Sequence, residues 1–289
     1  MAKSKTILLT GASSGFGKLA VPLLIERGHR VIGGIRGGQE RMKTIFPDLA
    51  SAIASGQLSA VDLHMEQPET FQKARDHIRE KEQGRLDVLI NNAGYGIMAP
   101  IESQSPEQLR GQFEVNFFGP ALLTRALMPE LRAARGRVLN ISSIAGLVSF
   151  PFYASYNASK FALEGLTEAL YYEFEPFGIQ VGMIEPGAFK TSFVKASLNE
   201  SDSLAAADSP YRERMTKFNQ LIRSKGKITG GNPIWVARLI VKLCERRRVP
   251  MRNIIGVDAR FMNLIRRLLP DRVRIALLSF VFRKILLQE

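Results

Sequence analysis

The chain has 289 residues, a hydrophobic fraction of 45% and a formal net charge of +13. A chain of this length can form one large α/β domain with an ordinary core. Its one cysteine, Cys244, excludes an intramolecular disulfide bond and fits a reducing cytosol. The three histidines are scattered without the spacing of metal ligands, so we expect no metal site.

Short apolar runs alternate with helical patterns along the chain. Strands are predicted at residues 6–10, 30–35, 58–61, 86–90, 136–141, 179–184 and 252–257. Helices are predicted at residues 17–27, 68–82, 106–133, 156–174 and 233–246. This alternation predicts an α/β fold, a doubly wound parallel sheet with helices on both faces. We expect a single domain over residues 1–259 and a basic, partly helical extension over residues 260–289.

A glycine-rich turn follows the first predicted strand. Gly11, Gly15 and Gly17 lie between the apolar run 6–10 and a helical pattern that ends at Gly28. Gly11 permits a tight turn, and the other two glycines let backbone approach a pyrophosphate at the positive end of a helix. The alternative is a glycine-rich turn without a ligand, but the order strand, turn, helix favours a dinucleotide site.

The end of the second predicted strand bears on the choice of cofactor. An acidic residue there would bind the ribose 2′-hydroxyl of NAD, whereas a basic residue would accommodate the 2′-phosphate of NADP. The stretch 31–38 has no carboxylate and has Arg36 where the acid would lie. Because a guanidinium can meet a phosphate with paired, charge-assisted hydrogen bonds, we expect NADP(H) in preference to NAD(H). The alternatives are an arginine that points into solvent and an NAD(H)-dependent enzyme.

The stretch 142–160 has a serine, Ser143, before a Tyr-x-x-x-Lys pair, Tyr156 and Lys160. In a helix, residues four apart project from one face. A free tyrosine has a pKa near ~10, and a nearby ammonium lowers that pKa by favouring the phenolate. Ser143 could donate a hydrogen bond to a carbonyl oxygen beside Tyr156. The pattern predicts proton transfer to an oxygen during hydride transfer, although a Tyr and a Lys at this spacing are more often helix surface.

The chain resembles the short-chain dehydrogenase/reductases over roughly residues 5–258, because five motifs of that family occur in the correct order. They are TGxxxGxG at residues 10–17, NNAG at 91–94, the helix asparagine Asn116, the trio Ser143, Tyr156 and Lys160, and the pair Pro186-Gly187 followed by Thr191. The resemblance implies a Rossmann-type fold and an NAD(P)-dependent oxidoreductase acting on CH-OH donors. A non-catalytic, cofactor-binding relative is the alternative, and the complete trio argues against it.

The resemblance also implies roles for single residues. Tyr156 transfers the proton, Lys160 lowers the pKa of Tyr156 and binds the nicotinamide ribose, and Ser143 polarises the carbonyl. Asn116 would hold a water that links Lys160 to solvent, or it is a structural asparagine bonded to backbone. Asp62 matches the family aspartate beside the adenine. The implied cofactor-binding residues are Gly11, Ser13, Ser14, Gly15, Phe16, Gly17, Arg36, Asp62, Asn92, Ala93, Gly94, Tyr156, Lys160, Pro186, Gly187 and Thr191.

Apolar and aromatic residues are concentrated in segments expected at the carboxyl edge of the sheet, where ligands of open α/β folds bind. Such a lining suits a hydrophobic ketone or aldehyde and its alcohol, of steroid, retinoid or fatty type. The segments 31–36 and 252–260 most resemble the branch that contains 17β-hydroxysteroid and retinol dehydrogenases. The expected substrate contacts are Ser143, Phe150, Tyr153, Tyr156 and Phe189, some of whose aromatics could instead be core.

Residues 188–232 are predicted to cover the substrate. Their polar stretch 195–210 is either a lid that orders on binding or a disordered surface loop.

The C-terminal part of the chain carries much of the positive charge. Residues 246–289 contain eleven Lys and Arg against three Asp and Glu, and basic residues interrupt every apolar run. No run approaches the ~20 residues that span a bilayer. An interfacial helix on a membrane surface and a helix packed on the core or on a second subunit both fit, whereas no nucleic-acid-reading motif is present. We expect a cytoplasmic homodimer or homotetramer, with association to a membrane surface left open.

Overall fold

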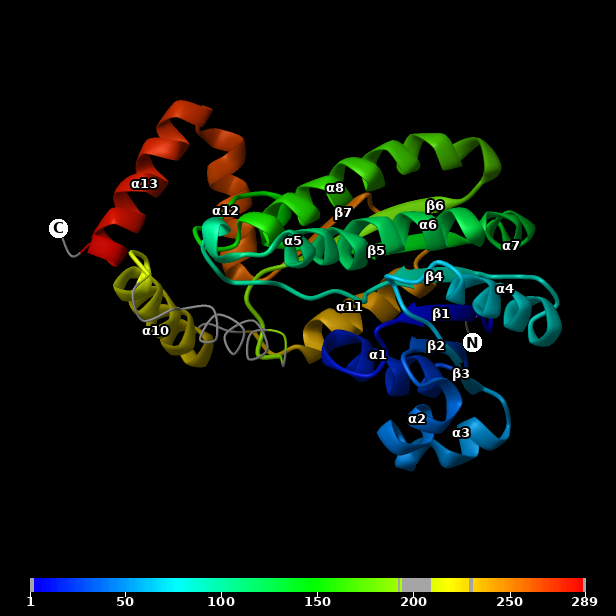
Figure 1. Ribbon diagram of the computed structural model, residues 1–289. Helices are drawn as coiled ribbons and strands as arrows, with labels where there is room; N and C mark the ends of the chain where they lie inside the picture. The colour runs from blue at the N-terminus through cyan, green and yellow to red at the C-terminus, as the bar shows by residue number, and fades with distance from the viewer. Residues whose placement is uncertain (1–2, 192, 194–208, 229–230, 288–289) are drawn as a thin grey trace.

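Over residues 3–191, 193, 209–228 and 231–287, which the computed structural model describes, the chain forms a seven-stranded parallel sheet covered by helices (Figure 1). The strand order is β3-β2-β1-β4-β5-β6-β7, and every neighbouring pair is parallel. The strands are β1 (Thr6–Thr10), β2 (Arg30–Ile35), β3 (Leu58–Asp62), β4 (Val88–Asn91), β5 (Arg137–Ile141), β6 (Gln180–Pro186) and β7 (Arg252–Ile255). All seven lie where the sequence predicts them, with differences of a few residues at the ends.

The strand order reverses between β1 and β4, which pair directly although two strands separate them in sequence. Ligands of doubly wound folds bind at such a reversal, outside the carboxyl ends of the strands. The glycine-rich turn follows β1, and the NNAG stretch ends β4. The topology therefore brings these two motifs together at one edge of the sheet.

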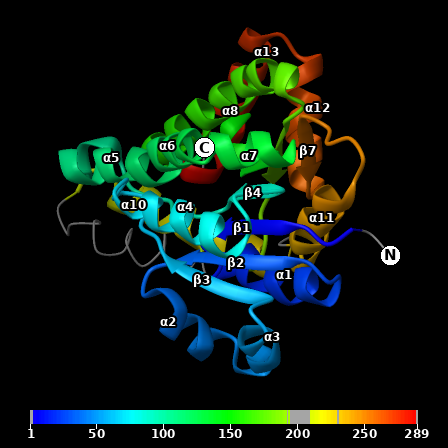
Figure 2. The ribbon, with the colours of Figure 1, turned by 90° about the vertical axis from the view of Figure 1, so that its right-hand side faces the viewer.

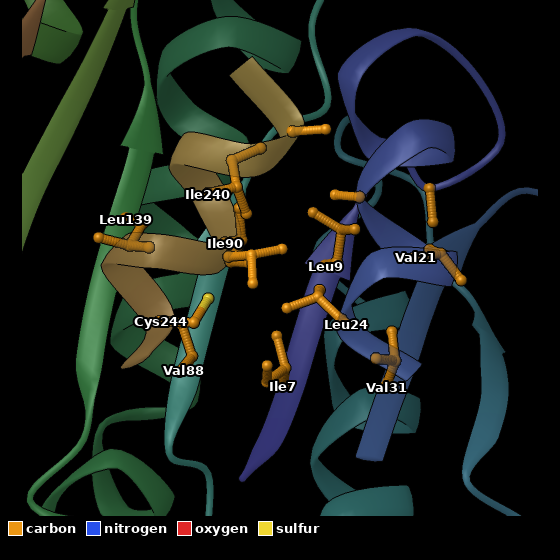
Figure 3. Close-up of a cluster of buried hydrophobic side chains, with 14 of the residues drawn as sticks. Ile7, Leu9, Val21, Leu24, Val31, Val88, Ile90, Leu139, Ile240 and Cys244 are labelled. Atoms are coloured by element: carbon orange, nitrogen blue, oxygen red, sulfur yellow. The ribbon is translucent and has the colours of Figure 1, made fainter. Parts of the chain in front are cut away.

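Each face of the sheet has its own buried cluster, because the strands are apolar on both sides. Helices α1 (Gly15–Glu26) and α11 (Ile234–Glu245) cover one face, where Leu9, Ile90 and Ile240 are fully buried (Figure 3). The buried thiol of Cys244 belongs to the same cluster. The other face is covered by α4 (Thr70–Lys81), α6 (Gly119–Ala126), α7 (Met128–Ala134) and α8 (Ala154–Phe174) (Figure 2).

The helix predicted over residues 106–133 is divided into several pieces. Helix α5 (Pro106–Phe113) begins with a capping box between Ser105 and Gln108 and runs into one π-helical turn, Glu114–Phe118. Prolines in the first turns of α6 and α7 mark new starts, because a proline cannot donate the backbone hydrogen bond of a continuing helix. Asn116 lies in this π-helical turn. Such turns are frequent places for functional residues.

Among the described residues, the helices α2 (Gly38–Ile45), α3 (Ala50–Ala54) and α10 (Arg212–Ile228) were not predicted from the sequence. Helices α12 (Val257–Leu268) and α13 (Asp271–Leu287) make up most of the basic extension that was expected to be partly helical. Short 3₁₀ turns occur at Pro47–Leu49, Ile101–Ser103, Ile144–Gly146 and Glu175–Phe177. The predicted boundary at 259/260 falls inside α12, so the fold is one domain that ends in helices. Within the described part of the chain, no helix is both long and apolar enough to cross a bilayer. Of the predicted lid, residues 192, 194–208 and 229–230 lie outside the described residues.

Candidate active site

The ends of β1 and β4 are joined by side-chain hydrogen bonds. The Thr10 hydroxyl accepts from the backbone N–H groups of Asn92 and Ala93, both at 3.0 Å. The Asn92 amide donates to the carbonyl oxygens of Thr10 at 2.9 Å and Gly11 at 3.2 Å. These bonds hold the glycine-rich turn against the NNAG stretch, as the sequence predicts for two halves of one nucleotide site.

Gly17 and Gly15 of this turn are needed for different reasons, the first for lack of space and the second for its backbone conformation. A Cβ on Gly17 would lie 2.5 Å from the Gly11 carbonyl oxygen, so only hydrogen fits there. Gly15 has a φ of +54°, and a Cβ on it would meet no atom within 4 Å. Ser14 caps α1 with extended backbone, and its side chain makes no capping hydrogen bond. The start of α1 therefore has open space beside Gly15 and no side-chain cap, an arrangement that fits a bound pyrophosphate.

Arg36 is exposed directly after β2. The next N–H, of Gly37, donates to the Asp62 carboxylate at 2.9 Å, and this bond is the main cause that holds the pKa of Asp62 below its usual value. A second guanidinium, of Arg41 in α2, donates to the Arg36 carbonyl oxygen at 3.3 Å and is also exposed. The strand end thus carries two cations, of which the sequence reasoning identified only Arg36.

The catalytic candidates Ser143 and Tyr156 are buried beside each other. Ser143 follows β5 and caps a 3₁₀ turn, accepting a hydrogen bond from the Ala145 N–H at 3.1 Å. Tyr156 lies in the first turn of α8, and burial raises its pKa to about 12, while a hydrogen bond with Ser143 acts in the opposite direction. Tyr156 is therefore a neutral acid at physiological pH, as a proton donor to a developing alkoxide must be.

Lys160 lies one turn further along α8 and is also buried. Its ammonium donates to the Ile141 carbonyl oxygen at 2.8 Å and lies 5.9 Å from the centre of the Tyr156 ring. Burial lowers the pKa of Lys160 to about 8, and the charge of Glu164 opposes this. In this structure desolvation is the largest influence on the pKa of Tyr156, and the expected lowering of that pKa by Lys160 stays a prediction.

Asn116 is bonded to the backbone that follows β4. Its side-chain oxygen accepts from the Tyr95 N–H at 3.1 Å, and its amide donates to the Tyr95 carbonyl at 2.9 Å and to the Ser159 hydroxyl at 3.1 Å. These bonds to backbone match one of the two roles that the sequence left open for Asn116, that of a structural asparagine. A Cβ on Gly94 would lie 3.1 Å from the Asn116 oxygen and 3.7 Å from the Lys160 nitrogen. Gly94 therefore lies between the Asn116 oxygen and the Lys160 nitrogen. A water that links Lys160 to solvent through Asn116 stays a prediction.

Two aromatic rings lie next to Tyr156. The ring of Phe193 lies 5.5 Å from that of Tyr156, and the ring of Tyr153 lies 5.8 Å from it. Phe218 of α10 packs in turn on Tyr153 at 6.4 Å and on Phe152 at 5.4 Å. Helix α10, which lies within the segment 188–232 that the sequence predicts to cover the substrate, thus supplies part of the apolar wall.

Two predicted substrate contacts lie elsewhere. Phe189 is only 4% exposed, belongs to the core cluster of α1 and α11, and packs edge-on against Phe16 at 5.8 Å. Its position supports the cofactor turn rather than the substrate. Phe150 lines a surface hollow with Pro151, Ala158 and Phe161 at the outside of α8. An aromatic residue near a motif in sequence can point to the other side of a strand or helix, and substrate contact by Phe150 and Phe189 stays a prediction.

A buried ion cluster lies behind the site, and sequence reasoning missed it. One nitrogen of the Arg252 guanidinium, on β7, lies 2.6 Å from the carboxylates of both Glu164 and Glu185. Glu164 is one turn after Lys160, and Glu185 precedes the Pro186-Gly187 pair. Burial is the main cause that raises the pKa of both carboxyls. The three residues join α8, β6 and β7.

The Pro186-Gly187 segment has a second tie to the C-terminal part of the chain. The Asp258 carboxylate accepts from the Ala188 N–H at 2.6 Å, and the Gly187 N–H donates to the Ile255 carbonyl at 2.9 Å. Thr191 follows, with its N–H bonded to the Phe189 carbonyl at 2.9 Å. In the part of the chain that the structure describes, no group of three or more His, Cys, Asp or Glu side chains could hold a metal ion.

Comparison with protein families agrees with this geometry. The family model described as short chain dehydrogenase matches residues 5–202. A solved short-chain dehydrogenase from Streptomyces avermitilis superposes with a TM-score of 0.78 at 34% identity, covering 96% of each chain.

Two relatives of named activity are also similar in sequence. The 3-ketodihydrosphingosine reductase of Bacteroides thetaiotaomicron is 36% identical over 86% of this chain and 87% of its own length. Retinol dehydrogenase 8 of Bos taurus is 32% identical over 90% of this chain and 84% of its own length.

Proposed function

This chain belongs to the short-chain dehydrogenase family and is an NAD(P)-dependent oxidoreductase, and we propose that it uses NADP(H) to interconvert a hydrophobic ketone or aldehyde and its alcohol. The observation that carries the proposal is the buried pair Ser143 and Tyr156 at the carboxyl end of β5, with Lys160 one turn behind.

The chemistry follows from what each side chain can do with a proton. Tyr156 is neutral at physiological pH, as a free phenol already is, and burial raises its pKa further. Its hydroxyl can therefore donate to the oxygen of a carbonyl under reduction. Ser143 holds that oxygen from the other side, where negative charge develops. Lys160 places a positive charge near the phenolate that Tyr156 becomes, with its own nitrogen anchored to the Ile141 carbonyl.

The residues around the glycine-rich turn fit a nicotinamide dinucleotide. Backbone N–H groups at the start of α1 are open to the pyrophosphate, since a Cβ on Gly15 would meet nothing within 4 Å. Asn92 and Ala93 would bound the same crevice, and Lys160 would reach the nicotinamide ribose. When bound, the dinucleotide supplies or accepts the hydride. Preference for NADP(H) is supported by the exposed cations Arg36 and Arg41, which would attract a 2′-phosphate.

An apolar substrate is supported by the rings that contact Tyr156. Phe193 and Tyr153 lie within 6 Å of its ring, and Phe218 and Met98 are buried next to them. Such walls bind hydrocarbon, and they offer a polar ligand few hydrogen bonds. Two relatives, a 3-ketodihydrosphingosine reductase and a retinol dehydrogenase, are named for apolar substrates, which also supports the proposal.

The test is the change in nicotinamide absorbance with a panel of ketones and aldehydes of increasing chain length. We expect NADPH-dependent turnover with kcat/KM that rises with apolar size, and a lower kcat/KM with NADH. Nicotinamide binding without turnover of any carbonyl or alcohol would support the non-catalytic alternative. Equal kcat/KM with NADH and NADPH would refute the cofactor preference alone.

The assembly is part of the proposal as well. We propose a homodimer or homotetramer in which α8 takes part, since that helix exposes Phe161, Tyr171 and Tyr172 to solvent. Sedimentation of the wild type against a Phe161→Ser/Tyr172→Ser variant tests it. A monomeric wild type would refute the assembly and leave the chemistry untouched.

A further inference from the structure

Helix α12 leaves a continuous apolar stripe uncovered. Val257, Phe261, Leu264 and Leu268 are 85%, 59%, 52% and 69% exposed. Their spacing of four, three and four residues places them on one face of the helix. A helix packed on a core would bury such a stripe, and here it is the opposite side, with Ala259, that is buried. The described residues therefore leave the stripe available to a partner.

Cations flank the stripe. Arg260 and Arg267 are exposed and follow Val257 and Leu264 by three residues, so both lie along the same side of the apolar face. Helix α13 also exposes apolar residues beside basic ones. They are Val273, Leu277 and Phe280 on one side and Ile275 on the other, with the basic residues Arg272, Arg283 and Lys284. The Lys284 nitrogen lies 4.9 Å from the Phe280 ring. We call the exposed side of α12 and α13 the apolar–basic face.

The acidic residues of this region are already engaged. Residues 257–287 contain seven Lys and Arg against two Asp. Asp258 accepts from the Ala188 N–H, and Asp271 accepts from Arg274 at 2.8 Å. The apolar–basic face thus combines hydrocarbon with net positive charge. That combination is complementary to an anionic lipid surface, in which acyl chains lie beneath negative headgroups.

The face adjoins the active site. Phe282, on the inner side of α13, packs with Met98 and Phe218 in the apolar cluster that also includes Tyr153. Tyr153 in turn lies against Tyr156. Helices α10, α12 and α13 lie at one end of the molecule (Figure 1), and α12 starts at the carboxyl end of β7. A surface bound to this face would therefore lie close to the apolar wall of the catalytic site.

We propose that the apolar–basic face docks the enzyme on an anionic membrane surface, and that the substrate reaches Tyr156 from the lipid. The entry of substrate from the lipid rests on the proposed function, whereas the docking on the membrane does not. A second copy of the chain fits less well, because two such faces would bring several cations together while Asp258 and Asp271 are already engaged within the chain. Nucleic acid would meet the cations but would leave Val257, Leu264 and Leu268 without a role.

The experiment is sedimentation of the full chain with vesicles of phosphatidylcholine containing phosphatidylserine, or phosphatidylcholine alone, at low and physiological salt. We expect binding to the anionic vesicles that weakens with salt. Arg260→Gln/Arg267→Gln should weaken it about 30-fold, since each cation near such a surface contributes roughly fivefold. Phe261→Gln/Leu264→Gln should weaken it by more than about tenfold.

Matched controls separate docking from general charge and from misfolding. Arg247→Gln/Arg248→Gln removes the same charge from exposed residues that precede the amino end of β7, whereas α12 follows its carboxyl end. This variant should leave vesicle binding nearly unchanged. Phe177→Gln controls for the loss of an exposed aromatic ring outside α12 and α13, in the 3₁₀ turn that follows α8. All variants should keep the melting temperature of the wild type, because the replaced side chains are exposed.

Three outcomes would overturn the docking proposal. The first is that the wild type does not bind anionic vesicles at low salt. The second is that Arg247→Gln/Arg248→Gln weakens vesicle binding as much as Arg260→Gln/Arg267→Gln does. The third is a change of oligomeric state in Phe261→Gln/Leu264→Gln, which would assign the face to a second copy. Turnover of a short, water-soluble ketone without vesicles distinguishes the two proposals. Its absence would count against the proposed function, while vesicle binding would still decide the docking.

Discussion

Replacing Arg252 by methionine should destabilise the protein through two buried carboxylates. Glu185 is fully buried and the Glu164 side chain is 7% exposed, and both lie 2.6 Å from the same Arg252 nitrogen. Removing one partner of a buried ion pair costs about 3–5 kcal/mol, because an uncompensated charge is left behind. This is a large part of the roughly 5–15 kcal/mol by which a domain is stable. Glu168, at 3.5 Å and half exposed, should contribute little.

The loss should depend on pH in a defined direction. Burial holds the pKa of both carboxyls above the usual 4.5, and loss of the arginine raises both further. A carboxyl with a raised folded pKa binds its proton more tightly in the folded state, so its cost grows as pH rises through that pKa. Arg252→Met should therefore be most destabilised near about pH 8 and recover part of its stability near about pH 5.

The measurement is the free energy of unfolding in urea at these two pH values. Arg248→Met, in which an exposed arginine is lost, is the control and should change stability by less than about 0.5 kcal/mol. Adding Glu185→Gln to Arg252→Met should restore part of the loss, because one buried charge is removed. A loss below about 1 kcal/mol, the value of a surface pair, or a loss equal at both pH values would refute the reasoning.

Three further predictions concern the catalytic residues. Tyr156→Phe should lower turnover about 10²–10⁴-fold with nearly unchanged NADPH affinity by fluorescence titration, and a variant that keeps more than about a tenth of the activity would exclude Tyr156 as the acid. Arg36→Asp should raise the KM for NADPH and lower that for NADH, and unchanged KM values would show that Arg36 does not contact the cofactor. Because burial lowers the pKa of Lys160 to about 8, its charge is lost above that pH. The reduction rate should fall there, and a pH–rate profile that stays flat to about pH 10 would contradict this role.

The strands and the motifs at their ends were readable from the sequence, because both depend on local patterns. Seven apolar runs bounded by turns gave the sheet, and alternation with helices implied that it is parallel. In such a sheet the carboxyl ends share one edge, so Gly11, Asn92 and Ser143 had to lie together. The four-residue spacing of Tyr156 and Lys160 fixed their common helix face.

Contacts between segments far apart in the chain were decided only by the tertiary structure. The bridge from Arg252 to Glu164 and Glu185 joins residues up to 88 positions apart, and no local pattern marks such a pair. The pKa values of Tyr156 and Lys160 depend on desolvation, which is set by everything packed around them.

The same limit applies to the apolar residues. Amphipathic spacing shows that α12 has an apolar face, but it does not show whether other residues cover that face. Phe189 is the opposite example, because the sequence suggested contact with substrate and the structure buries the ring in the core. Periodicity reports which side chains share a face. What lies against that face is determined by the whole fold, and this is why the stripe from Val257 to Leu268 could be seen in the sequence and its exposure could not.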